Sequence, residues 1–168
     1  EAMTFESFKY HYDQIKPRRI ILSGLGEPLL NHDIFKMSSY AGENGSVVNL
    51  PSNFTLAGKY LDQIHGSGIS QIKVSIDAAN RDTYQKIRGV DEFDEIVDAI
   101  KTLNHLKIAA GLRKPAIRFN FAVQDENIEE LVDFVDLSHR LKVNTIYFQY
   151  LEFVGIEDRK PKLVDKLK

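Results

Sequence analysis

The sequence predicts an α/β fold in which about five parallel strands alternate with helices along one domain. Its 168 residues, 43% of them hydrophobic, are enough to bury a single core. Five apolar stretches of strand length are separated by segments whose apolar residues recur at helical spacing. Because a complete (β/α)8 barrel takes about 250 residues, this pattern leaves two architectures, a curved partial barrel or an open doubly wound sheet.

The predicted elements alternate from a first helix to a last strand. The opening helix covers 4–16, with Phe5, Phe8, Tyr12 and Ile15 on its inward face. The expected strands are 19–24, 47–51, 72–77, 117–123 and 143–151. The other expected helices are 31–44, 56–64, 93–106 and 127–141, with a short additional helix before 93–106.

Two of the later helices have a continuous apolar face. In 93–106 this face holds Phe93, Ile96, Val97, Ile100 and Leu103. In 127–141 it holds Ile128, Leu131, Val132, Val135 and Leu141. Asn127 and Glu130 together form a capping-box-like start for the second of these helices. We expect both faces to pack against the sheet.

The composition argues against several classes of function. A net charge of −2 and a pI near 6.2 argue against a nucleic-acid partner or an acidic membrane surface. The lack of cysteine excludes disulfides, cysteine-ligated zinc and an iron–sulfur cluster held by this chain. The sequence has no HExxH pair, Walker loop, nucleophile elbow or GxGxxG fingerprint, and we expect no metal site.

The chain shows neither an apolar run of membrane-spanning length nor a leader-like start, so we expect a cytoplasmic protein. The composition shifts near Gly155, where the chain becomes rich in lysine. We therefore expect one domain over 1–154, followed over 155–168 by a charged tail or the start of another segment.

Glycines and polar residues follow each predicted strand, where open α/β folds bind their ligands. The candidates are Gly24, Gly26, Glu27 and Pro28 after the first strand, Ser52 and Asn53 after the second, Ser75, Asp77 and Arg88 after the third, and Asn120, Gln124, Tyr147 and Gln149 on the last two. We expect these residues to surround a small zwitterionic or nucleoside-like ligand.

Each candidate also has a purely structural interpretation. The two glycines can form a tight turn, and the serine, asparagine and acidic residues can cap helices. Arg88 can form a surface ion pair, and Tyr147 can belong to the barrel wall. Two other functions stay open from the residues alone: an acid–base enzyme that uses Glu27 and Asp77, and a non-catalytic binding or scaffold domain.

Several segments, in this order, resemble the radical S-adenosylmethionine superfamily. The turn Gly24–Pro28 is similar to the family's GGEP motif, and Pro51–Leu56 is similar to its TNGTL segment, with Phe54 in place of glycine. Val74–Ala78 and Tyr84–Gly89 resemble the VSLDG and YxKIRG stretches. The segments 119–131 and 143–151 resemble the fifth strand with its helix and the sixth strand.

The resemblance implies a partial (β/α)6-type TIM-like barrel, truncated at its N-terminus to about five strands. It implies a parent enzyme in which a [4Fe–4S] cluster reductively cleaves S-adenosylmethionine to a 5′-deoxyadenosyl radical. The family's CxxxCxxC loop, which holds the cluster, would lie just before residue 1 together with one further strand. Because this chain has no cysteine, we expect it to hold no cofactor by itself and to be inactive alone.

The resemblance also implies roles for the candidate residues and partners. The Gly24–Pro28 turn would hold the methionyl amino group, Ser75 and Arg88 would approach the carboxylate or the substrate, and Tyr147 would flank adenine. A peptide or protein is the substrate class that the resemblance favours. A missing strand would leave the edge of 19–24 open, so we expect the chain to self-associate through this edge.

Overall fold

The computed structural model describes residues 2–150, which form one sheet of five parallel strands with helices. The strands are β1 (Arg19–Ile21), β2 (Val47–Ser52), β3 (Ile69–Ser75), β4 (Ala116–Val123) and β5 (Thr145–Tyr150), and their order in the sheet is their order in the chain. All four neighbouring pairs are parallel. The prediction of about five parallel strands is confirmed, and the residues 151–168 lie outside the described part of the chain.

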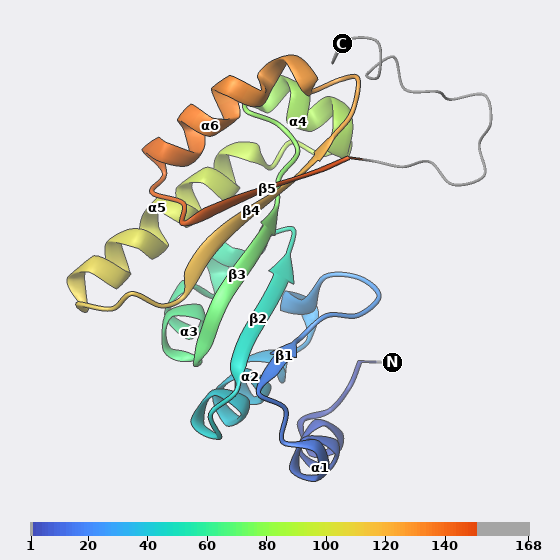
Figure 1. Cartoon of the computed structure of the whole chain (residues 1–168), viewed down its shortest axis with the longest axis vertical. Helices are drawn as coiled ribbons and strands as arrows, with labels where there is room; N and C mark the ends of the chain where they lie inside the picture. The colour runs from blue at the N-terminus through green and yellow to red at the C-terminus, as the bar shows by residue number, and fades with distance from the viewer. Residues whose placement is uncertain (1, 151–168) are drawn as a thin grey trace, which may run out of the picture.

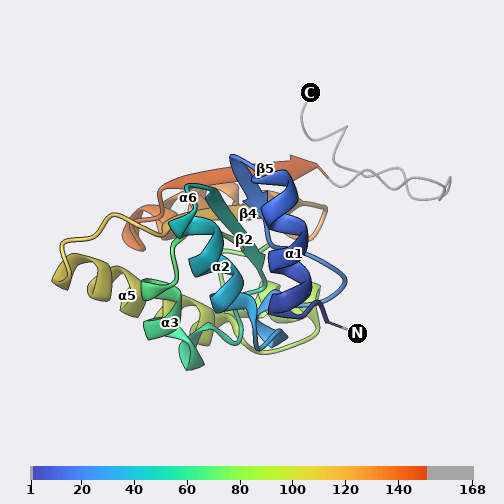
Figure 2. The same ribbon diagram turned by 90° about the horizontal axis from the view of Figure 1, so that it is seen from below.

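The helices lie on one side of this sheet. They are α1 (Phe5–Ile15), α2 (Ile34–Glu43), α3 (Leu61–Gly66), α4 (Arg81–Arg88), α5 (Phe93–Ala109) and α6 (Leu131–Arg140). Every crossover advances one strand in the same direction, so right-handed connections place the helices on the same face (Figures 1 and 2). A doubly wound sheet reverses its strand order and carries helices on both faces, so this topology excludes that alternative and matches the partial barrel.

Three short 3₁₀ helices change the predicted element boundaries. They are η1 (Pro28–Leu30), η2 (Ala57–Lys59) and η3 (Ile128–Glu130). The helix predicted over 31–44 begins only at Ile34, because the Asn31 side chain accepts the Asp33 N–H and holds the chain in a turn. The helix predicted over 56–64 is divided into η2 and α3. Tight turns at the starts of these helices therefore delay the regular α-helical part.

The core lies between the sheet and the helices. Alternate residues of the central strands, including Ile72, Val74, Ile117 and Phe119, are fully buried against the helices. The predicted apolar face of α5 is confirmed, since Phe93, Ile96, Val97, Ile100 and Leu103 are all buried. In α1, Phe8 and Tyr12 are buried as predicted, whereas Ile15 is exposed because it lies at the last turn, beyond the helix–helix contact.

The predicted face of the last helix is confirmed at Leu131 and Leu141, which pack against or within the core, but it is wrong at two valines, and the predicted cap is wrong. Val132 and Val135 are 73% and 45% exposed, and Phe134 is buried instead. The Phe134 ring lies 4.4 Å from that of Phe121 in β4, so aromatic packing sets the rotation of α6. The Asn127 side chain forms no helix cap, because it accepts the Gln124 N–H and donates to two carbonyl groups at the end of the sheet.

Candidate functional site

The glycine turn leaves the sheet immediately after β1. The Leu22 N–H still donates to the Asn49 carbonyl at 2.9 Å, but the predicted strand 19–24 ends at Ile21. Within residues 2–150, no hydrogen bond engages the backbone of Ser23, Gly24, Leu25 or Gly26. Gly26 has φ of +96°, a conformation that favours glycine. The turn therefore presents consecutive N–H and C=O groups that can bind a charged ligand.

Glu27 connects this turn to the end of β2. Its Oε1 accepts the Ser52 hydroxyl at 2.7 Å and the Leu29 N–H at 3.1 Å, and its Oε2 accepts the Asn53 N–H at 2.8 Å. Pro28 follows as the first residue of η1, so the acid caps this short helix as its structural interpretation predicted. Glu27 thus holds the glycine turn against the end of β2, and its oxygens are occupied by protein donors.

Asn53 closes a tight turn next to Glu27, and it does not form the helix cap that its structural interpretation predicted, because η2 begins after Leu56 without a side-chain cap. Its Oδ1 accepts the Thr55 N–H at 3.1 Å and the Thr55 hydroxyl at 3.0 Å. The following residue, Phe54, has φ of +66° although it is not glycine, and its side chain is buried. The departure from the glycine of the resembled segment is therefore accommodated by a left-handed backbone and a buried ring.

A second polar cluster lies at the carboxyl ends of β3 and β4. A pocket of about 380 Å³ brings together Ser75, Asp77, Arg88 and Asn120, with Gln124 and Gln149 also among its lining residues. Ser75 and Asn120 are register partners on adjacent strands, and Tyr147 of β5 is the next partner in the same row. Six of the predicted candidates thus share one pocket, as expected from the rule for strand ends.

Asp77 and Arg88 form an ion pair inside this pocket. The Arg88 Nη2 lies 2.5 Å from the Asp77 Oδ2, and the Ala122 N–H donates to the Asp77 Oδ1 at 2.7 Å. The Asp77 side chain is 9% exposed and that of Arg88 is 32% exposed. Asp77 and Glu27 belong to separate clusters, and both are occupied by protein donors. This geometry gives no support to an acid–base pair made from these two residues.

Arg118 is a polar residue of this region that the sequence reasoning missed. Its Nε donates to the Asn120 Oδ1 at 2.9 Å, and its guanidinium carbon lies 4.2 Å from the centre of the Tyr147 ring. Tyr147 is therefore a cation–π partner at the sheet surface and is 45% exposed. The strand alternation contained the signal, because Arg118 and Asn120 are two residues apart and share one face.

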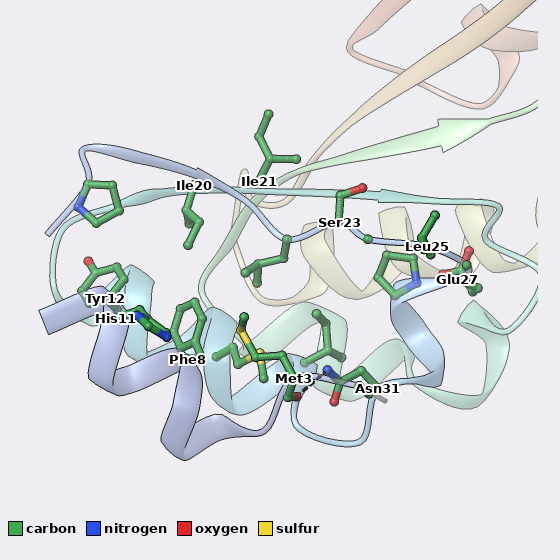
Figure 3. Close-up of a pocket in the computed structure, with 18 of the residues that line it drawn as sticks. Met3, Phe8, His11, Tyr12, Ile20, Ile21, Ser23, Leu25, Glu27 and Asn31 are labelled. Atoms are coloured by element: carbon green, nitrogen blue, oxygen red, sulfur yellow. Dashed lines mark hydrogen bonds between the residues drawn. The ribbon is translucent and has the colours of Figure 1, made fainter. Parts of the chain in front are cut away.

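An apolar cavity of about 780 Å³ lies between α1, β1 and the glycine turn. Figure 3 shows Ile20 directed toward α1, with Phe8, His11 and Tyr12 on the helix side and Ser23, Leu25 and Glu27 along the turn. The Asn31 amide donates to the Met3 carbonyl at 3.0 Å and closes one end. Gly24, Gly26 and Pro28 also line this cavity, so the candidates of the first turn lie at a different hollow from those of the Ser75 pocket. Ser52, Asn53 and Tyr147 line neither of these two hollows.

The residues suit an organic ligand better than a metal cluster. The chain contains no cysteine and supplies no thiolate for an iron–sulfur cluster. Within residues 2–150, no group of three or more acidic or histidine side chains is arranged to hold a metal ion. The open backbone at Ser23–Gly26 and the polar pocket at Ser75 offer hydrogen-bonding groups to a small charged ligand. None of the helices in this part of the structure is long and apolar enough to cross a membrane.

The fold and the site define a partial-barrel α/β domain with polar groups gathered at the carboxyl ends of its strands. The model of the radical SAM superfamily matches residues 1–138, and the chain belongs to that superfamily. It is 33% identical over 132 residues to a probable GTP 3′,8-cyclase of Saccharolobus solfataricus, which covers 78% of this chain and 41% of the relative.

Two further comparisons agree with this family. The chain is 29% identical over 168 residues to an AdoMet-dependent heme synthase of Methanosarcina barkeri, which covers 96% of this chain and 45% of the relative. It superposes with a TM-score of 0.76 on Streptococcus suis SuiB bound to precursor peptide SuiA, at 16% identity over 90% of this chain and 34% of that one. The last likeness confirms the partial-barrel fold alone. The chain spans less than half of the length of these curated relatives.

Proposed function

We propose that this chain is the cofactor-binding part of a radical SAM enzyme and that it contacts S-adenosylmethionine at the two polar regions described above. Family membership and the open backbone of Ser23–Gly26 support this proposal most directly. The turn would hold the methionyl ammonium group. Ser75, Arg88 and Asn120 would contact the carboxylate or the ribose, and Tyr147 would flank the adenine.

Each part of the site would do a separate task in binding. Glu27 would position the turn and the Asn53 backbone, because its oxygens already accept three protein donors. Asp77 would orient the Arg88 guanidinium through their ion pair. When bound, the cluster of this family supplies the electron that cleaves the sulfonium. Since this chain has no cysteine, its own residues bind and orient the organic cofactor only.

Two finer statements about partners also belong to the proposal. A peptide or protein substrate finds support in the fold shared with SuiB, which was solved with its precursor peptide. Self-association finds support in β1, whose outer edge pairs with no other strand of residues 2–150. The backbone groups of Arg18 and Leu22 bond to β2, so those of Arg19 and Ile21 face away from it.

Ligand-observed NMR with S-adenosylmethionine tests the cofactor proposal on the 168-residue chain. We expect weak saturation transfer that Ser75→Leu abolishes, because the larger side chain would fill the pocket. Ser75→Ala should weaken it partly through loss of the hydroxyl. The control Ser7→Leu changes an exposed serine of α1 and should leave the signal intact. Undiminished transfer in a folded Ser75→Leu variant, verified by thermal melting, would refute this assignment.

A further inference from the structure

The connection between β4 and α6 is tied to the end of β3 by one buried side chain. Asn127 is fully buried. Its Nδ2 donates to the Asp77 carbonyl at 2.9 Å and to the Ala122 carbonyl at 2.8 Å, and its Oδ1 accepts the Gln124 N–H at 2.8 Å. Both amide donors and the amide oxygen therefore have partners, which fixes the orientation of the side chain. One amide thus joins the C-terminal ends of two neighbouring strands.

Glu130, on the same connection, holds the start of α4. Its Oε2 accepts the Ala79 N–H at 2.7 Å, and its Oε1 accepts the Asn80 side-chain amide at 2.8 Å and the Thr83 hydroxyl. Asn80 is the N-cap of α4, and its own Oδ1 accepts the Thr83 N–H. Figure 1 shows the start of α6 beside α4, in agreement with these bonds. An acid from a later strand–helix unit therefore fixes the N-terminal end of the helix that carries Arg88.

Both contacts bear on the ion pair of Asp77 and Arg88. Asp77 follows β3, and Arg88 is the last residue of α4. The Ala122 N–H donates to the Asp77 Oδ1, and the Arg88 Nη2 lies 2.5 Å from the Asp77 Oδ2. Asn127 binds the carbonyl groups of Asp77 and Ala122, so it fixes both residues of the bond between that N–H and the carboxylate. Glu130 fixes the other partner, because it holds the helix from which Arg88 reaches the pocket.

Neither Asn127 nor Glu130 lines the polar pocket at the ends of β3 and β4. Both act on residues that do line it: Asn127 on Asp77 and Gln124, and Glu130 on the helix of Arg88. A guanidinium binds a charged ligand well only when its planar set of donors is held in one direction. That rigidity comes from supporting residues whose own hydrogen bonds are complete. The two residues outside the pocket are therefore placed to control the geometry of its charged group.

We infer that Asn127 and Glu130 are positioning residues of this pocket, which set the direction of the Arg88 guanidinium through Asp77 and through α4. The inference rests on the proposed function, because it gives these residues a role in orienting the group that would contact S-adenosylmethionine. It assigns a role in ligand binding to a connection that touches no ligand itself. Loss of either residue should release Arg88 and thereby weaken binding.

Two NMR measurements on the 168-residue chain test this inference. The first needs no ligand. A guanidinium paired with a carboxylate rotates slowly, so Arg88 should give separate Nη–H signals at low temperature, assigned by their absence in Arg88→Lys. Asn127→Ala and the milder Glu130→Gln should merge these signals. The second is a titration with S-adenosylmethionine followed by saturation transfer, in which each variant should raise the Kd about fivefold, the equivalent of one lost hydrogen bond.

The matched controls change residues of the same type at helix contacts outside the pocket. Asn104→Ala removes a buried amide that donates to the Leu141 carbonyl at 2.7 Å. Asp33→Asn alters an acid that accepts the Phe5 N–H at 3.0 Å, at the start of α1. We expect both controls to keep the Arg88 signals and the Kd, even where their melting temperature falls as far as that of Asn127→Ala.

The inference would be overturned if the folded Asn127→Ala and Glu130→Gln variants kept the Arg88 signals, or if the controls lost them equally. It would also be overturned if the signals merged while the Kd stayed unchanged. Should Asn127→Ala fail to fold, Glu130→Gln decides, because one of its side-chain atoms remains an acceptor. Failure of the proposed function is distinguishable, because the unchanged chain would then show no saturation transfer while the Arg88 signals still responded to both variants.

Discussion

Removing the Glu27 carboxylate should destabilise the whole domain, because one side chain joins the glycine turn to the end of β2. Its oxygens accept three hydrogen bonds, from Leu29, Ser52 and Asn53. At about 1 kcal/mol for each bond, Glu27→Ala should lower the free energy of unfolding by about 3 kcal/mol. That is a large fraction of the roughly 5–15 kcal/mol that holds a typical domain together.

Glu27→Gln should have an intermediate effect. The amide oxygen of glutamine can still accept hydrogen bonds at the position of one carboxylate oxygen. At the other position stands the amide nitrogen, which is itself a donor and would face a donor such as the Asn53 N–H. We expect a loss of about 1–2 kcal/mol, consistent with one broken bond and one unsatisfied donor. The order of stability should therefore be unchanged chain, Glu27→Gln, then Glu27→Ala.

Urea unfolding followed by circular dichroism measures these differences. With a slope of about 2 kcal/mol/M, the midpoint of Glu27→Ala should fall by about 1.5 M. The control is Glu43→Ala at the exposed end of α2, where an acid gains nothing from the helix dipole, and its midpoint should be unchanged. A Glu27→Ala midpoint equal to that of the control would refute the view that this carboxylate holds the glycine turn against the end of β2.

Three further perturbations test other parts of the fold. Phe54→Gly should relax a backbone φ of +66° yet lower stability by about 2–4 kcal/mol in urea, since the buried ring contributes more than the strain costs. The Phe5 N–H, with Lys36, holds the pKa of the Asp33 carboxyl below its ordinary value of 3.8. Stability from a lowered pKa is present above the unfolded value and lost as pH falls through the folded one, so from about pH 5 downward the urea midpoint should fall less for Asp33→Asn than for the unchanged chain. Ile21→Lys should dissociate any edge-paired assembly in sedimentation experiments.

Each of these tests has a contrary outcome. A more stable Phe54→Gly variant would mean that backbone strain outweighs burial at that position. Equal loss of midpoint with falling pH in Asp33→Asn and the unchanged chain would mean that the bond to Phe5 does not favour the ionised carboxyl. A clean monomer of the unchanged chain at micromolar concentration would argue against pairing through β1.

Local pattern was sufficient to predict the fold class and most strand positions. The central strands are recognisable because their alternate residues are strongly apolar, and α5 is recognisable because its long apolar face repeats without interruption. The rotation of α6 could not be predicted in this way. It depends on the packing of Phe134 against Phe121, which belongs to a different element. Tertiary aromatic packing here determined the face that the helix buries.

The candidate site was predictable in position but not in its internal contacts. The strand-end rule placed Ser75, Asp77 and Asn120 in one pocket before any contact was known. Whether the acid of the turn is free for a ligand depends on Ser52, which lies 25 residues away in sequence. Sequence spacing does not report such a long-range bond. Sequence spacing also did not predict the contact of Arg118 with Tyr147, although the alternation within β4 indicated the sheet face on which Arg118 lies.

The sequential order of the strands also has a consequence for biosynthesis. Each strand from β2 to β5 needs only the strand made just before it to complete its first ladder of hydrogen bonds. A chain that emerges from the ribosome can therefore add one strand–helix unit at a time to a sheet that is already formed, without waiting for its C-terminal end. Such stepwise growth keeps loop-closure distances short and limits the time during which apolar strands remain unpaired.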